Sequence, residues 1–412
     1  MRAHLGALVC VSFSPWAAGQ TFSGLGFLPG ESASKAVAIA RHSGAVIGVS
    51  PADPGHSWVW EQESGIQSLP LGAGAEAALI CDDGGTIVAT TANPNGSVNI
   101  TWLREGQPAT ILPDAHLPIV GLSGDGEVVF LSTPDYQFGQ LQRWTAAGGL
   151  VSLPNGPNLD GDSTHGYFGG FHAGWFGASD FQGIQALGRG WNYYCIPCCG
   201  GECSGLFIDH VDFYWSADSG TGVMPNSSDS IRGQILGASE DLFYKIVAIG
   251  GSGVGMIVGE QAPFLLPGLT FTPSTPAVIS GNGSVASAGD QVWDAANGTR
   301  SIYQVLASVG APFDGWSSLV VTGLDARGRR LCGYGTNPAG RTEAWTAVLA
   351  CSSADFNGDG DLGTDADIQS FFDCLGGQGC PPFRTPDFNG DGDVGTDADI
   401  EAFFRVLAGG TC

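Results

Sequence analysis

Basic residues are scarce in this chain. Its 15 lysines and arginines stand against 40 aspartates and glutamates, which gives a formal net charge of -25. A surface of this sign repels phosphate, so the charge argues against nucleic acid and anionic membranes as partners and favours cations. The Gly-x-Ser-x-Gly nucleophile elbow is absent, and the glycine run 250–255 does not match a phosphate-binding fingerprint. The composition therefore indicates no familiar catalytic class.

Charged residues of either sign are also few, at 13%, whereas hydrophobic residues make up 43% of the 412 positions. A chain of this length can bury a large core and form two or three domains. The 66 glycines and 23 prolines are poor material for a helix bundle and favour short strands joined by tight turns. We expect an all-β fold for most of the chain.

Long apolar runs are missing as well. After the first 19 residues nothing reaches the 18 apolar residues of a membrane-spanning helix, so no membrane span is expected. Residues 1–19 contain Arg2, an apolar run from Leu5 to Phe13 and small residues before Gln20. This pattern is typical of a secretory signal peptide and predicts an extracellular or cell-surface location. The 10 cysteines that remain favour disulfides over free thiols in such a compartment.

A repeated unit dominates residues 20–350. Four tryptophans are each followed after 10 or 11 residues by a proline, and Leu-Pro or Met-Pro markers recur at steps of 41, 43, 41, 71 and 42 residues. The run from Ser301 to Ser308 occupies the next expected position without a proline and makes seven markers. The markers are Pro29, Pro70, Pro113, Pro154, Pro225 and Pro267, and the tryptophans are Trp60, Trp102, Trp144 and Trp215.

Each period contains four short strand-like runs separated by turn residues. In the first period these runs cover 36–40, 45–50, 56–62 and 65–70. Four antiparallel strands repeated at about 42 residues indicate a β-propeller blade. The last repeat ends after Trp345 without a closing strand, while residues 22–29 form a closing strand without a blade. We therefore predict a seven-bladed β-propeller whose N-terminal strand completes the seventh blade.

The tryptophan that recurs at a fixed place in each repeat is expected to pack between blades, because an indole buries a large area and needs a partner for its N–H alone. Stacking of sugars on these rings is the alternative interpretation. Residues 21–350 resemble the HAF-repeat extracellular proteins. His56-Ser57-Trp58 stands at the position that gives the family its name, and 333–345 resembles the end of such proteins. The resemblance implies a propeller fold and export, and no catalytic residues.

An insertion interrupts the fourth repeat at about 157–210. It is rich in aromatic residues and contains four cysteines in CIPCCGGEC, for which two disulfides are preferred and a zinc site is the alternative. Long loops on a propeller often carry the binding face. The candidate ligand-binding residues, for a glycan, are Trp175, Trp191, Tyr193 and Tyr194. A purely structural flap is the competing interpretation.

The composition changes at residue 351. Two copies of one motif, 354–372 and 386–404, are offset by 32 residues, and 12 acidic residues minus 2 arginines give the segment 352–412 a net charge of -10. The start Asp-x-Asn-x-Asp-Gly is typical of a calcium loop, because oxygen ligands at positions 1, 3 and 5 converge around a sharp turn. Thr364 and Thr396 are expected to cap the helices that follow. The candidate ligands to two Ca²⁺ ions are Asp355, Asn357, Asp359, Asp361, Asp365, Asp367, Asp387, Asn389, Asp391, Asp393, Asp397 and Asp399.

Residues 351–412 resemble the dockerin module, a pair of EF-hand-like calcium loop-helix units that docks onto a cohesin. The family has a carboxylate ligand at loop position 12, where this chain has Ala366 and Ala398. The apolar phase of the following helices makes Asp367 and Asp399 the expected terminal ligands. The resemblance implies a small α-helical, calcium-stabilised domain with a cohesin-like or other cell-surface partner. We also expect disulfides between Cys351 and Cys412 and between Cys374 and Cys380.

Two functions from different classes follow. The first is a secreted, non-catalytic binding or scaffold propeller that is attached to a partner or surface through the calcium-dependent tail. The alternative is a polysaccharide-degrading enzyme, a glycoside hydrolase or lyase, on a propeller scaffold. The enzyme would need two or three Asp or Glu side chains with His or Arg at one mouth of the central channel. A structural cell-surface protein that uses the tail for sorting is a third possibility.

Overall fold

The computed structural model falls into two compact units, which are described separately. Residues Thr21–Leu349 form one unit, and Ala350–Cys412 belong to the other. No helix among the described residues is long and apolar enough to cross a membrane. The structure describes residues 21–51, 56–71, 74–93, 98–112, 119–132, 141–153, 167–168, 177–179, 185–197, 203–216, 220–223, 235–249, 252–259, 261–272, 276–308, 311–349, 354–357, 359, 361, 363–381, 386, 388 and 395–408.

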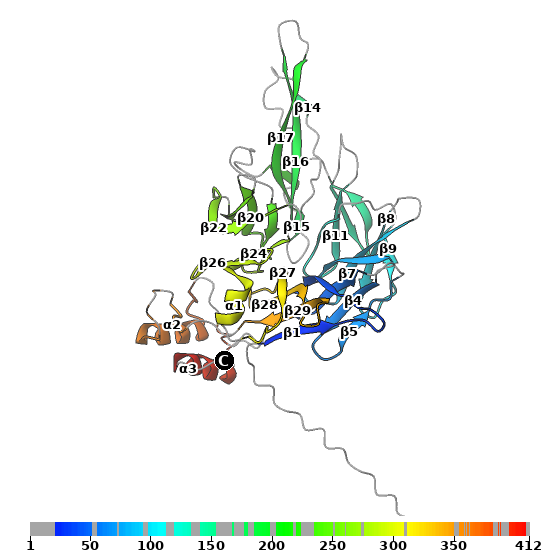
Figure 1. Cartoon of the computed structure of the whole chain (residues 1–412). Helices are drawn as coiled ribbons and strands as arrows, with labels where there is room; N and C mark the ends of the chain where they lie inside the picture. Colours follow the sequence, from blue (N-terminus) through cyan, green and yellow to red (C-terminus); the bar gives the residue numbers. More distant parts are fainter. Residues whose placement is uncertain are drawn as a thin grey trace, which may run out of the picture. The chain divides into compact units, whose positions relative to one another are not determined.

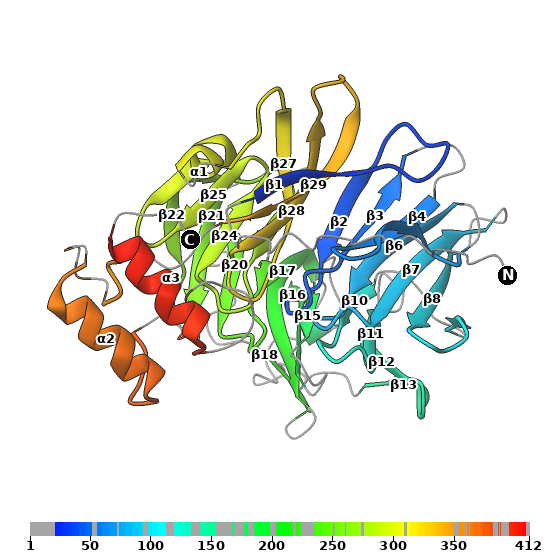
Figure 2. The same ribbon diagram turned by 90° about the horizontal axis from the view of Figure 1, so that it is seen from below.

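The described residues of the larger unit form antiparallel sheets, six with four strands and one with five. They are numbered first to seventh below in chain order (Figures 1 and 2). The first three are β2 (Lys35–Ile39), β3 (Val46–Ser50), β4 (His56–Glu61) and β5 (Gly65–Ser68); β6 (Ala75–Ile80), β7 (Thr86–Ala92), β8 (Val98–Arg104) and β9 (Thr110–Ile111); and β10 (Ile119–Leu122), β11 (Val128–Ser132), β12 (Leu141–Thr145) and β13 (Gly149–Ser152).

The fourth sheet has five strands, and the seventh takes its outermost strand from the start of the chain. The fourth contains β14 (Tyr167–Phe168), β15 (Gly177–Ser179), β16 (Gln185–Pro197), β17 (Cys203–Ser216) and β18 (Gly220–Val223). The last three are β19 (Ile235–Ala238), β20 (Tyr244–Ile249), β21 (Gly253–Val258) and β22 (Phe264–Thr270); β23 (Ala277–Ile279), β24 (Val285–Ala288), β25 (Gln291–Asp294) and β26 (Gly298–Ser301); and β27 (Ser317–Leu324), β28 (Arg330–Thr336), β29 (Thr342–Val348) and β1 (Thr21–Gly26).

Contacts between the innermost strands join each sheet to the next. Strand β2 contacts β6, β6 contacts β10, and β10 contacts β15 of the fourth sheet. The series continues through β19, β23 and β27, and β27 contacts β2 again. Figure 2 shows the sheets succeeding one another in chain order around a common centre. A ring of antiparallel four-stranded meanders is a β-propeller, as the repeats predicted.

The N-terminal strand joins the last sheet. Strand β1 pairs antiparallel with β29, with Thr21 opposite Val348 and Gly24 opposite Trp345. The ring of Phe22 stacks on Trp345 at a centroid distance of 5.4 Å and meets Trp316 edge-on at 5.1 Å. The predicted pairing of the first strand with the last repeat is confirmed. Because the two ends of the unit share one sheet, that sheet cannot form until both are present.

Hydrophobic clusters fill the spaces between neighbouring sheets. Trp58 lies in a cluster shared by the seventh and first sheets, and Trp345 lies in one shared by the sixth and seventh. Trp102 and Trp144 meet between the second and third sheets at a centroid distance of 5.4 Å, and Trp102 Nε1 donates to Gly126 O at 3.0 Å. The prediction of inter-blade tryptophans is confirmed for Trp102, Trp144 and Trp345, whereas in the first sheet the fully buried indole is Trp58 and the predicted Trp60 is only partly buried.

The expectation that the tryptophans share one position is wrong. Each tryptophan lies on the third strand of its sheet and pairs with a residue of the second strand, which is counted here from the turn that precedes it. Trp60 and Trp144 pair with the first residue after that turn, and Trp102 pairs with the second. Trp58 and Trp345 pair with the third. The gap to the following proline is 10 residues for Trp60 and Trp144 and 11 residues for Trp102. The one-residue difference in this gap matches the one-residue shift in pairing.

The seventh sequence marker is a helix rather than a closing strand. Residues 298–301 form the outer strand β26, and Ile302–Ser308 form helix α1. Ile302, Val305 and Leu306 stand at helical spacing and are buried. Ser301 N donates to Gln304 Oε1 at 2.9 Å, and Gln304 N donates to Ser301 Oγ at 3.2 Å, which is a capping box. This 3.6-residue pattern outweighs the position of the run in the repeat.

Much of the predicted insertion is regular sheet instead of loop. The hairpin of β16 and β17 continues the strand pairing as far as Pro197 opposite Cys203, and Figure 1 draws it as the longest hairpin. Strand β15 pairs with the first residues of β16, as an innermost strand does, whereas β14 pairs farther along, at Tyr193 and Tyr194. The extra sequence therefore lengthens the two middle strands of an ordinary sheet.

The second unit contains helices α2 (Asp365–Leu375) and α3 (Asp397–Leu407). Four phenylalanines form its core, one from each loop and one from each helix, and all are fully buried. The rings of Phe371 and Phe403 stack at 4.2 Å. The other two core rings are Phe356 and Phe388. The duplicated sequence thus supplies equivalent residues to one small core.

The predicted apolar helix faces are only partly buried. Phe372 and Phe404, which were expected to share these faces, are 39% and 43% exposed, and their rings lie 6.2 Å apart. Phe356 and Phe388 take the central positions instead, because they follow the loop aspartates directly and point inward from the turn. The sequence prediction overlooked these two loop residues.

Candidate functional site

The first calcium-like loop ends at a capped helix. Thr364 is the N-cap of α2 and has extended backbone angles, and Asp367 at the third helical position completes a capping box with it. Gly363 adopts a positive φ of 67°, which a glycine tolerates without strain. The predicted cap is confirmed. It fixes Asp367 against the start of the helix.

Three carboxylates converge at this loop. One oxygen from each of Asp355, Asp359 and Asp367 lies within 4.8 Å of the other two. Asp359 is exposed, Asp355 is half-buried and Asp367 is fully buried. Asp359 and Asp367 lie 4 and 12 residues after Asp355 in the sequence. The three side chains meet because the loop folds back onto the first turn of α2. Their mutual repulsion would be relieved by a cation between them.

Asp367 is the most constrained of the three. Its Oδ1 accepts from the Asn357 amide at 3.1 Å, and its Oδ2 accepts from Thr364 N at 2.8 Å and Thr364 Oγ1 at 3.0 Å. Burial alone would raise the pKa of Asp367, but these hydrogen bonds outweigh it and hold the pKa below its ordinary value. The side chain is therefore an ionised carboxylate with a fixed orientation.

Asn357 and Asp359 form the front of the loop. Asp359 N donates to Asn357 Oδ1 at 2.9 Å, and Asn357 Nδ2 donates to Asp359 Oδ2 at 2.8 Å. Asp361 N donates to Asp359 Oδ1 at 2.9 Å. These turns bring successive side-chain oxygens to one side of the loop.

The donor set fits a hard divalent cation. Calcium takes six to eight oxygen ligands in a flexible arrangement, and carboxylates with an amide oxygen supply that chemistry. Asp355, Asp359 and Asp367 would hold the ion, with Asn357 able to add its side-chain oxygen. Of the acidic candidates in this loop, Asp361 and Asp365 are exposed and do not belong to the convergent group among the described residues.

The second loop has the same capping arrangement as the first, with Asp399 and Thr396 in place of Asp367 and Thr364. Asp399 is fully buried, and its Oδ2 accepts from Thr396 N at 2.8 Å and from Thr396 Oγ1 at 3.1 Å. Asp397 is exposed at the start of α3. Asp387, Asn389, Asp391 and Asp393 lie outside the described residues.

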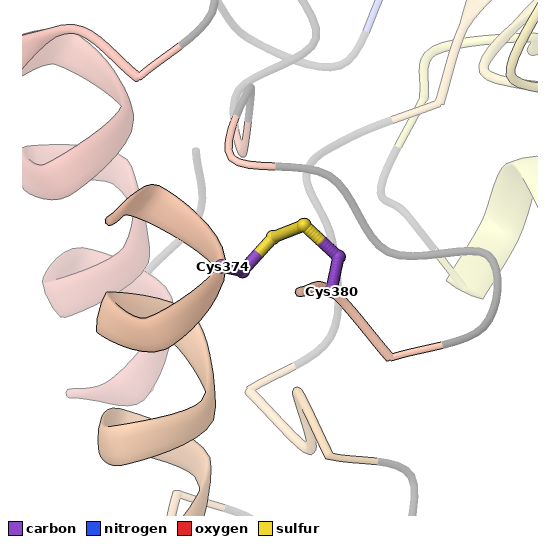
Figure 3. Close-up of a disulfide and its surroundings, with 2 residues drawn as sticks. All are labelled: Cys374 and Cys380. Carbon is purple, nitrogen blue, oxygen red and sulfur yellow. A yellow bond between two sulfur atoms is a disulfide. The ribbon is translucent and has the colours of Figure 1, made fainter. Parts of the chain in front are cut away.

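Some of the described cysteines form a disulfide and others are free thiols. Cys374 and Cys380 form a disulfide at the end of α2, as predicted (Figure 3). Cys81 and Cys332 are buried free thiols, so the general expectation of disulfides is wrong for them. Cys81 lies in the turn directly after β6 and Cys332 lies in β28, and both side chains are buried. Cys351 and Cys412, Cys198 and Cys199 lie outside the described residues, and Cys195 and Cys203 are placed by backbone alone.

The aromatic candidates of the insertion are placed by register. Trp191 lies opposite His210, Tyr193 opposite Ile208 and Tyr194 opposite Phe207, in the hairpin of β16 and β17. Trp175 lies outside the described residues. The backbone brings three of the four candidates into one hairpin.

A charged group that the sequence did not single out lies at one end of the ring. Arg41 and His42 of the first sheet approach Ala238 and Glu240 of the fifth, and Asp82 of the second sheet lies beside them. The charged residues of this group occupy turns between the first two strands of their sheets, and Ala238 is the last residue of β19. Most repeats carry an acidic residue in this turn, so the linear pattern gave no reason to choose these.

Comparisons add the following. No family model and no curated protein matches the chain. Solved structures that are similar include the β-propeller domain of the Trilobed protease from Pyrococcus furiosus, at 10% identity and a TM-score of 0.46, with 77% of this chain and 95% of that chain covered. The Cps50 (Swd1) β-propeller domain of Myceliophteria thermophila has 11% identity and a TM-score of 0.46, with 79% and 99% covered. TolB from Acinetobacter baumannii has 11% identity and a TM-score of 0.37. This chain covers 55% of its length, and 57% of this chain is matched.

Proposed function

We propose that this chain is an exported seven-bladed β-propeller that binds or organises other molecules without catalysis and is attached to a partner through a calcium-dependent, dockerin-like tail. The observation that carries the proposal is the convergence of Asp355, Asp359 and Asp367 within 4.8 Å beside a capped helix. The duplicated helices α2 and α3 and their shared phenylalanine core support a tandem module. The partner is a cohesin-like or other cell-surface protein.

Calcium has a structural role in this proposal. The tail is small, and its core of four phenylalanines is enclosed by loops that bring like charges together. A bound cation would offset that repulsion and hold each loop against its helix, so that metal binding and folding are coupled. The tail would then be ordered outside the cell, where calcium is plentiful, and loosened by chelators.

Calcium titration of the full chain tests the proposal. Asp367→Asn should weaken calcium binding at the first loop by at least about tenfold, since it removes a buried charged ligand. Asp365→Asn is the matched control, because Asp365 is exposed at the first position of α2 and is not one of the three convergent carboxylates. Isothermal titration calorimetry would measure both. Equal calcium affinity in the two variants, or no calcium binding by the wild-type chain, would contradict the proposal.

The alternative function, a polysaccharide-degrading enzyme, is favoured by one observation. Asp82 and Glu240 with His42 and Arg41 form the kind of group that such an enzyme would need at one mouth of the channel. Release of new reducing ends from plant and bacterial polysaccharides would support it, provided that Asp82→Asn abolishes the release. No release by the wild-type chain leaves the non-catalytic proposal in place.

A further inference from the structure

The turns between the innermost and second strands form one end of the ring. Backbone hydrogen bonds link them from sheet to sheet: Ala326 N donates to Arg41 O at 3.0 Å, His42 N to Asp82 O at 2.7 Å, and Asp82 N to Gly124 O at 2.9 Å. The turns of the fifth, sixth and seventh sheets are joined in the same way. We call this end of the ring the mouth. It is formed, among the described residues, by 40–45, 81–86, 123–128, 239–244, 280–285 and 325–330.

Two side chains reach across the mouth. Arg41 Nη2 donates to Ala238 O at 2.9 Å, and His42 Nε2 lies 3.3 Å from Glu240 Oε1. The first and fifth sheets are not neighbours in the ring, so these contacts span the opening. Glu240 also takes the space above Gly281, where a Cβ would lie 2.2 Å from its Oε1. Polar groups from the first, second and fifth sheets are thereby gathered at one point.

Asp82 is the unexplained member of this group. Its residue is 8% exposed, and its carboxylate makes no hydrogen bond to the part of the chain that the structure describes. Burial raises the pKa of Asp82, the nearby Arg41 lowers it, and Glu240 raises it. Glu240 Oε1 is a buried oxygen without a properly directed hydrogen bond among the described residues. Buried carboxylates normally have such partners, because losing them costs more than the net gain of a typical hydrogen bond.

If these residues served only to stabilise the ring, we would expect each carboxylate to accept a hydrogen bond from a neighbouring side chain. Arg41 instead donates to a carbonyl of the opposite sheet and leaves the Asp82 carboxylate without a directed donor. The side chains of His42 and Glu240 are 47% and 24% exposed, so the group is open to solvent on one side. The arrangement offers acceptors and donors side by side to a molecule that enters from the mouth.

We propose that the mouth binds a neutral, polyhydroxylated ligand, namely a saccharide, whose hydroxyl groups donate to Asp82 and Glu240 and accept from Arg41 or His42. A cation is disfavoured by the guanidinium, and His42, Asp82 and Glu240 do not form a metal-holding group among the described residues. An anion is disfavoured by the two carboxylates. Hydroxyl groups, which both donate and accept, suit the mixed set. This inference rests on the proposed binding role of the propeller and is independent of calcium.

The experiment uses the full chain in calcium-containing buffer. A panel of neutral oligosaccharides of glucose, galactose, mannose, xylose and arabinose is tested on an array, and calorimetry measures the affinity of each oligosaccharide that binds. Asp82→Asn and Glu240→Gln keep the side-chain shape and remove the charged acceptor. Each should weaken binding by about tenfold or more, as expected for a hydrogen bond to a charged group. Glu105→Gln, an exposed residue of the second sheet, is the control and should leave affinity unchanged.

The outcomes separate the possibilities. Thermal unfolding of each variant shows whether a loss of binding reflects loss of the fold, and two variants in different sheets guard against one that fails to fold. Saccharide binding that survives both substitutions would overturn the mouth as the site while keeping the binding role of the propeller. Binding of no oligosaccharide would overturn this inference, and the calcium titration would still decide the role of the tail.

Discussion

Two glycines lie directly beneath indole rings in the propeller core. A Cβ on Gly48 would approach the ring of Trp58 to 2.2 Å, and a Cβ on Gly333 would approach Trp345 to 2.6 Å and Val320 O to 1.8 Å. The cross-strand partners of these glycines are the same tryptophans. Glycine at positions 48 and 333 thus has a steric reason, since the indole covers the site where a side chain would stand.

Gly333→Ala should destabilise the larger unit by about 1–3 kcal/mol or more, because the backbone oxygen of Val320 cannot move aside as a flexible side chain would. Urea unfolding followed by tryptophan fluorescence would measure the change. Gly85→Ala is the control, since the nearest atom to its Cβ is an Asp83 carboxylate oxygen at 3.3 Å in an exposed turn. Equal stability of the two variants would contradict the steric explanation.

The free thiol of Cys332 should not react while the protein is folded. Burial raises its pKa to about 12, so almost no reactive thiolate exists at pH 8. Iodoacetamide should label Cys332 only after denaturation, and mass spectrometry would locate the label. Because the folded pKa lies above the thiol's ordinary value of 9.0, the stability that depends on this thiol is kept below pH 9 and falls as the pH rises from 9 toward 12. Labelling of Cys332 in native protein at pH 8 would refute this.

For individual residues, the sequence predicted the role of Asp367 but gave no indication of the position of Asp82. The helix phase after the loop favoured Asp367 over Ala366 as the inward residue, and the structure brings Asp367 together with Asp355 and Asp359. Asp82 stands in one of many acidic turns, and its place in the mouth depends on sheets far apart in the chain. Local periodicity indicates which residues of one helix face inward, but it does not indicate which residues of distant sheets come together.

Among the elements, the short strands were the most predictable. Their apolar runs alternate with Gly, Pro, Asp and Ser, and strands β2 to β5 fall within about two residues of the predicted ranges. The register between second and third strands was not predicted, because gaps of 10 and 11 residues were treated as one spacing, although Trp144 and Trp102 differ both in this gap and in their pairing. Helix α1 was missed because repeat position was given more weight than its apolar spacing.

Strand β1 should contribute more to stability than its six residues suggest. Phe22 is buried between Trp345 and Trp316, so Phe22→Ala should cost about 3–5 kcal/mol. Phe27→Ala is the comparison, because Phe27 is only half-buried and its ring faces the Arg341 guanidinium at 4.2 Å. Thermal unfolding of both variants would test the difference, and a smaller loss for Phe22→Ala than for Phe27→Ala would contradict the role given to the Phe22 ring.

For the whole molecule, the two compact units should respond separately to chelation. If calcium supports the tail, removal with EDTA should lower the unfolding temperature of the helical unit and leave that of the β-rich unit unchanged within about 1 °C, since stabilisation by a ligand follows its binding to the folded state alone. Calorimetric scans with calcium and with EDTA would measure both transitions. A shift of the β-rich transition as large as that of the helical one would contradict the separation.

The pairing of β1 with β29 also sets an order in time. During synthesis Thr21 emerges first of the residues in its sheet, yet its partner Val348 is made more than three hundred residues later. Each of the other described sheets is contiguous in sequence and can form as it leaves the ribosome. The first strand must wait, so a chain that stops short of β29 leaves Phe22 without its partner Trp345 and keeps an apolar end exposed to proteases. The pairing of β1 with β29 is therefore present in complete chains and missing from incomplete ones.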